Sequence, residues 1–183
     1  MACKSVTSYA KQCGRGISGG VQKLWMIGYS DLGVISGSTE NYALASGSTI
    51  VSNIALASGS TKFVSVGLLK ESVSFKGTSK RDSATGSFEN QTETSISISN
   101  ISEAAKTFID GLFDQPVAIL IKLRSGAYIV TGLNGFTELT DVEENSGTKN
   151  ADMNGYTLKL TGVEDGLTRT VDPTLIASIV DKV

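Results

Sequence analysis

The sequence predicts a mainly β protein, a sandwich or barrel with one flanking α-helix, a long β-hairpin arm and a possible C-terminal helix. Two observations lead to this fold class. Apolar and polar residues alternate over many short segments, and 20 glycines against two prolines supply turns between them. One segment alone, residues 100–113, has the 3.6-residue spacing of a clear amphipathic helix. A chain of 183 residues suffices for one core, so we expect residues 1–183 to form a single domain.

The composition excludes several classes of function. A net charge of −2 and a pI near 5.2 argue against a dedicated nucleic-acid binder. The chain has no histidine, so a Ser-His-Asp triad cannot form, and its two cysteines, Cys3 and Cys13, are too few for a metal site. No apolar segment is long enough to cross a membrane, and the N-terminus lacks a secretory signal. We therefore expect a protein of the cytosol that is not an enzyme and needs no cofactor, with both cysteines as free thiols.

Residues 14–19 match the letters of a G-x-G-x-x-G dinucleotide motif. That motif needs a strand before it and a helix after it, and here a strand follows, so the match is accidental. This strand starts at Val21, and its alternation predicts Trp25 as a core anchor.

The most unusual segment contains ALASGST twice, with a third SGST just upstream. Three apolar runs of strand length, residues 42–45, 50–57 and 62–69, are separated by Ser-Gly breaks with turn chemistry. The 12-residue spacing does not persist long enough for a solenoid. We expect a local β-meander or a pair of hairpins.

A long hairpin arm is expected over residues 71–99. Residues 71–76 and 87–99 alternate as strands do, and the polar loop KGTSKRDSATG joins them. This loop carries Lys76, Lys80 and Arg81. They form either a solvated basic tip or a docking arm for an acidic surface on another copy.

The helix over residues 100–113 is expected to be capped by Ser102. Strands over 117–123 and 127–133 follow, joined by the tight turn Arg124-Ser125-Gly126. Residues 155–163 alternate as a further strand, and Asp172-Pro173 is the expected start of a helix or arm over 172–183.

An acidic stretch lies between these last strands. We interpret it as a solvated acidic face rather than a metal site or a catalytic carboxylate pair, because the spacing of a calcium loop is missing. Its members are Glu138, Asp141, Glu143 and Glu144.

At this level of detail the chain resembles tail tube proteins of tailed phages that infect Bacteroidetes-type bacteria. The resemblance covers about residues 1–30 and 70–166. It is carried by the alternating hairpin, the short helix, the turn at Arg124-Ser125-Gly126, the glycine-bearing segment 132–136 and the closing segments 146–147 and 152–158. The opening, with Met1-Ala2-Cys3, Gly19-Gly20-Val21 and Trp25, is also similar. Residues 34–69 fall outside it, so they are expected to be a β-rich elaboration.

The resemblance implies a virion structural protein that forms stacked, hexameric rings around a channel for DNA. Its partners would be further copies of itself and other tail or neck proteins, with phage DNA as a non-specific passing cargo and no membrane binding. It would be assembled in the bacterial cytoplasm. Lys76, Lys80 and Arg81 would contact a neighbouring subunit, and the lumen would be acidic. A neck or connector ring of the same fold, or a carbohydrate- or receptor-binding β-sandwich, are the alternatives.

Overall fold

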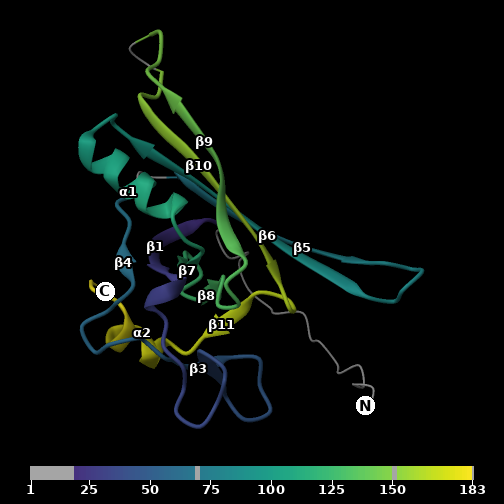
Figure 1. Ribbon diagram of the computed structural model, residues 1–183. Helices are drawn as coiled ribbons and strands as arrows, with labels where there is room; N and C mark the ends of the chain where they lie inside the picture. Colours follow the sequence, from purple (N-terminus) through teal and green to yellow (C-terminus); the bar gives the residue numbers. More distant parts are fainter. Residues whose placement is uncertain (1–18, 69–70, 150–151, 183) are drawn as a thin grey trace.

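The computed structural model describes residues 19–68, 71–149 and 152–182, and Cys3, Cys13 and most of the 14–19 motif lie outside them. The described chain is mainly β, with two sheets and two α-helices (Figure 1). The first strands are β1 (Val21–Gly28), β2 (Tyr42–Leu44), β3 (Val51–Ile54), β4 (Val64–Ser65), β5 (Val73–Arg81) and β6 (Phe88–Ser99). The second half contains α1 (Glu103–Phe113), β7 (Val117–Leu123), β8 (Tyr128–Thr131), β9 (Thr137–Asn145), β10 (Gly155–Glu164), β11 (Arg169–Val171) and α2 (Pro173–Ile179). This is the expected β-sandwich-like fold with a flanking helix.

The larger sheet has seven strands in the order β2-β3-β11-β8-β7-β1-β4. Residues 24–27 of β1 and 117–121 of β7 are buried on both faces of this sheet, because successive side chains point to opposite faces and both are covered there. Trp25 on β1 is 1% exposed and packs in one hydrophobic cluster with residues of α2. The prediction of Trp25 as a core anchor is confirmed, although β1 has two buried faces and not one.

The smaller sheet has four antiparallel strands in the order β5-β6-β10-β9. Leu158 and Leu160 on β10 face the larger sheet and join Ile119 of β7 and Ile109 of α1 in a second hydrophobic cluster. The β5–β6 hairpin and the β9–β10 hairpin project in different directions from this packed region (Figure 1). The larger sheet is therefore the middle layer, with a hydrophobic cluster on each of its faces.

Both helices begin where the sequence predicts. The Ser102 hydroxyl accepts a hydrogen bond from the Ala105 N–H (3.2 Å), which satisfies a free donor in the first turn of α1. The Asp172 carboxylate accepts from the Thr174 N–H (2.9 Å), and proline occupies the first turn of α2. The long hairpin and the C-terminal helix are both confirmed.

The repeated SGST segments are turns. In the first two, the N–H of Ser38 donates to the carbonyl of Ile35 and the N–H of Ser48 donates to the carbonyl of Ala45, both at 2.9 Å. The second turn joins β2 to β3 as an antiparallel hairpin. The expected meander does not continue, because β4 pairs with β1 at the opposite edge of the sheet. Phe63, just before β4, is fully buried there, whereas Val64 is exposed, so the third apolar run contributes Phe63 to the core.

Candidate assembly interface

The two sheets differ in the length of their edge strands. The larger sheet ends in β2 and β4, which are three and two residues long. The smaller sheet ends in β5 and β9, each nine residues long, and among the described residues neither has a neighbouring strand on its outer side. Short edge strands offer little to another chain, whereas long ones present a row of unpaired backbone groups. The edges of the smaller sheet are therefore the candidate site.

Strand β5 carries all three residues of the predicted basic tip, but it does not present them together. Lys76 lies across from Glu93 and Lys80 across from Glu89, and both lysines are exposed on the outward face of the sheet. Arg81 is on the other face, where its guanidinium carbon lies 5.7 Å from the centroid of the Phe88 ring. We had predicted a polar loop from Lys76 onward; that was wrong, because β5 continues to Arg81 and the turn is confined to residues 82–87.

Strand β9 contains the four predicted acidic residues, which the sequence had not placed in a strand. Glu138, Asp141 and Glu143 lie across from outward-facing residues of β10 and are exposed. Glu144 points to the opposite face, where it accepts a hydrogen bond from the Tyr156 hydroxyl (3.2 Å). The interpretation as one solvated acidic face is therefore corrected: three carboxylates share the outward face and Glu144 does not.

Contacts behind the sheet explain the position of Glu144. Its carboxylate lies 3.9 Å from the ammonium of Lys106 on α1, so it links β9 to the helix. Burial of the Tyr156 ring, and then the hydrogen bond to Glu144, raise the pKa of the Tyr156 hydroxyl above its ordinary value. Glu144 therefore contacts the α1 side of the sheet, although about half of its side chain (51%) stays exposed.

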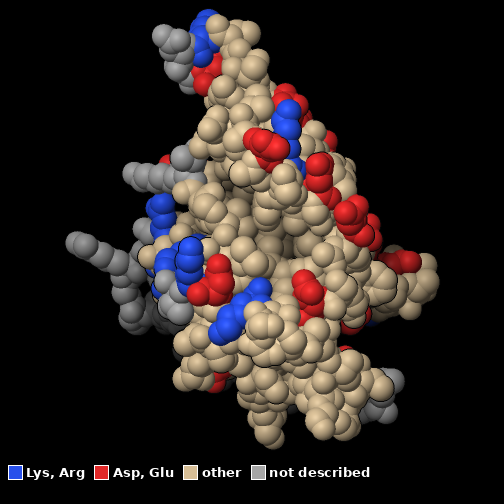
Figure 2. All heavy atoms as spheres, turned by 60° about the vertical axis from the view of Figure 1, so that its left-hand side comes forward, with Lys and Arg blue, Asp and Glu red and all other residues tan. Residues whose placement is uncertain are grey.

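The outward face of the four-stranded sheet is polar across its width. Lys159 on β10 forms an ion pair with Glu93 on β6 (3.3 Å), and serine and threonine surround it. One row runs across the strands from Lys76 through Glu93 and Thr161 to Glu138. Figure 2 shows a run of Asp and Glu side chains that descends along one margin of the molecule from a protruding end. The sheet thus has a basic edge and an acidic edge on the same face.

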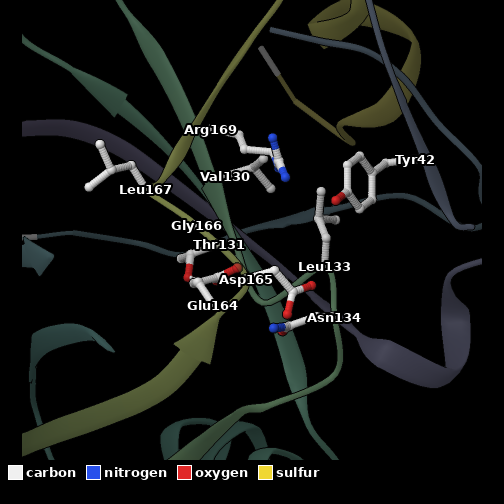
Figure 3. A pocket seen from close by; sticks show the side chains of 10 residues that line it. All are labelled: Tyr42, Val130, Thr131, Leu133, Asn134, Glu164, Asp165, Gly166, Leu167 and Arg169. Carbon is white, nitrogen blue, oxygen red and sulfur yellow. Dashed lines mark hydrogen bonds between the residues drawn. The ribbon is translucent and has the colours of Figure 1, made fainter. Parts of the chain in front are cut away.

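A small crevice lies at the end of β10, between that strand and β8 (Figure 3). Its main polar group is Glu164, whose carboxylate accepts from the Thr131 hydroxyl (2.6 Å) and the Gly132 N–H (2.7 Å). Arg169 lies over the Tyr42 ring on the other side, 5.5 Å from its centroid. The crevice encloses about 10 Å³, space for roughly one water molecule, so it is too small for an organic ligand.

Across residues 19–68, 71–149 and 152–182, no group of three or more His, Cys, Asp or Glu side chains is placed to hold a metal ion. None of the helices in these ranges has the length and apolar character needed to cross a bilayer. Comparisons with protein-family models, with curated proteins and with solved structures find no match for this chain.

Sequence reasoning missed β9 as a strand because of a bulge. Leu139 pairs with Leu160 and Asp141 with Lys159, so Thr140 is an extra residue and the two-residue alternation breaks. The only signal in the sequence was the inward pair Leu139 and Val142, three residues apart. Such spacing does not distinguish a bulged strand from a loop.

Proposed function

We propose that this chain is a virion structural protein, the subunit of a phage tail tube, which stacks as rings around a DNA-conducting channel. One observation carries the proposal: within residues 19–68, 71–149 and 152–182, an antiparallel four-stranded sheet has two open nine-residue edges and a polar face that no other element covers. Open edges of this length are an aggregation hazard in a monomer. A closed ring of copies removes them, because each sheet is extended by the next.

The charge of the uncovered face suits a channel for DNA. Its side chains are hydrophilic apart from Val163, and five carboxylates outnumber three ammonium groups. Excess negative charge repels phosphate, so DNA passes without adhering. The charged residues of this face are Lys76, Lys80, Glu89, Glu93, Glu138, Asp141, Glu143 and Lys159.

In this proposal the partners are further copies of the chain and other tail or neck proteins, and assembly takes place in the cytoplasm of the bacterial host. The protein has no enzymatic role and uses no cofactor. Phage DNA is a passing cargo that is not read by sequence.

Negative-stain electron microscopy of the purified full-length chain tests the proposal. Long tubes with stacked annuli are the expected result. Isolated rings that never stack would indicate a neck or connector ring built on the same fold. A monodisperse monomer at high concentration and at every salt concentration would overturn the proposal, and glycan binding by that monomer would favour a carbohydrate-binding sandwich.

A further inference from the structure

We propose that copies join head to tail, β9 of one copy against β5 of the next, and that opposite charges on these edges reject the two alternative pairings. The alternatives are β5 against β5 and β9 against β9, each around a two-fold axis. The inference rests on the proposed ring assembly and adds which edges meet and what excludes the wrong ones.

Strand direction alone does not choose among the three pairings. Each strand of the sheet is antiparallel to its neighbour, so with four strands β9 runs opposite to β5. A rotation about a ring axis places the next β5 antiparallel to β9 and continues the sheet. A two-fold axis between identical edges also produces an antiparallel pair. All three junctions can therefore form the same backbone hydrogen bonds.

The charges of the side chains on the two edge strands distinguish among the three pairings. Strand β5 (VSFKGTSKR) contains three basic residues and no acidic one, whereas β9 (TELTDVEEN) contains four acidic residues and no basic one. Side chains directly across from each other in an antiparallel pair lie close enough to interact, and like charges there are destabilising. Pairing β9 with β9 brings carboxylates together, and pairing β5 with β5 brings lysines together. Only the β9–β5 junction brings opposite charges together, so the edges combine attraction for one partner with repulsion of the others.

The rows across the sheet indicate which residues meet. Lys76 and Glu138 are the two ends of one row. When copies join without stagger, Glu138 of one copy therefore lies next to Lys76 of the following copy. The neighbouring row begins at Ser74 on β5 and ends at Asp141 on β9. If one copy is shifted by two residues along the strand direction, Asp141 takes the place of Glu138 next to Lys76. In both registers a carboxylate on the outward face meets the Lys76 ammonium.

Charge reversal on one edge at a time tests the inference. K76E/K80E replaces the two outward lysines of β5 by carboxylates, so the outward face is acidic at both edges. E138K/D141K leaves Glu143 as one carboxylate beside two lysines on the outward face of β9, so that face is net basic at both edges. Each variant alone should therefore need at least about tenfold more protein for half-maximal assembly. The four-fold variant K76E/K80E/E138K/D141K has swapped, complementary edges and should assemble again. An equimolar mixture of the two double variants should also assemble, in rings where they alternate. Sedimentation and negative-stain microscopy measure all four samples.

Matched controls separate edge effects from net charge. K23E/K182E and D110K/D165K change the net charge by the same amounts at exposed positions outside β5, β9 and the turns that flank them, and we expect both to assemble as wild type does. Thermal melts of every variant confirm folding. If wild type assembles and the double variants match it, or if neither the swap nor the mixture restores assembly, the edge pairing is wrong while the proposed function stands. If wild type forms no ring or tube, the proposed function itself fails.

Discussion

Replacing Thr131 by valine tests the polar contacts that join the two sheets beside the crevice. The Thr131 hydroxyl is buried, donates to the Glu164 carboxylate at 2.6 Å and lies 3.1 Å from the Thr92 hydroxyl. Thr131→Val keeps the shape and the β-branch of the side chain but removes both contacts. Glu164 keeps the Gly132 N–H, and Thr92 keeps a 3.4 Å contact to the Gly162 carbonyl.

The magnitude follows from the kind of hydrogen bond that is lost. A hydrogen bond to a charged group contributes about 1.5–3 kcal/mol, and a newly buried methyl group offsets up to about 0.8 kcal/mol of that. We expect a net loss of about 1.5 kcal/mol in the free energy of unfolding. For a domain of this size that lowers Tm by about 3–6 °C. Melts at one fixed protein concentration are required, because assembly raises the apparent stability.

Thr137→Val is the matched control. The Thr137 hydroxyl is equally buried, but it forms no hydrogen bond with any of the described residues. Removing it therefore costs no hydrogen bond, and we expect Tm to stay constant or to rise by an amount equivalent to about 1 kcal/mol. Equal losses in the two variants would show that steric fit, and not the bond to Glu164, controls stability at these positions.

Three further predictions concern single positions. Gly132 and Gly126 both have positive φ, but only at Gly132 would an added Cβ meet the backbone, 2.3 Å from the Val117 carbonyl oxygen. In urea titrations, Gly132→Ala should lower the free energy of unfolding by at least about 3 kcal/mol and Gly126→Ala by about 1 kcal/mol. Hydrogen bonds from the Thr174 N–H and hydroxyl lower the pKa of Asp172 below its ordinary value of 3.8. The charged Asp172 cap therefore stabilises α2 fully above pH 3.8, and this stabilisation is lost as the pH falls through the lowered pKa. Asp172→Ala should therefore lower Tm at neutral pH, and its difference from wild type should shrink as the pH falls below 3.8. The Lys182 carbonyl accepts a hydrogen bond from the Trp25 indole N–H (2.8 Å), and truncation after residue 180 removes it. Fluorescence emission from this single tryptophan should then shift to the red, and unchanged emission would show that the C-terminus does not hold Trp25 in place.

Sequence reasoning was most accurate where an element depends on its own residues. The Ser102 cap, the Pro173 start of α2 and the turn at Arg124-Ser125-Gly126 are local features, and all three are found in the structure. It was least accurate at strand ends in polar sequence. Strand β5 continues through KGTSKR because pairing with β6, and not local propensity, stabilises it there. Strand β11 is only three residues long and was not predicted at all.

The candidate site shows the same division. The sequence alone identified a basic segment and an acidic segment. It left open whether the basic one is solvated or contacts another copy, and the family resemblance implies the contact. It did not place Arg81 and Glu144 on faces opposite to their charged neighbours, because a strand's register and bulges decide which way each side chain points. Nor did it show that the two segments are opposite edges of one sheet.

The amino-acid sequence by itself determined the mainly β class, the positions of both helices, the long hairpin and the burial of Trp25, because period, capping and turn chemistry act within a few residues. Only the tertiary structure decided that β4 crosses to the far edge of the larger sheet and that β5 and β9 bound the smaller one. Those choices depend on contacts between residues far apart in the chain, where burying apolar faces selects one pairing among several with equal local propensity. That pairing places the basic segment and the acidic segment at opposite edges of the smaller sheet.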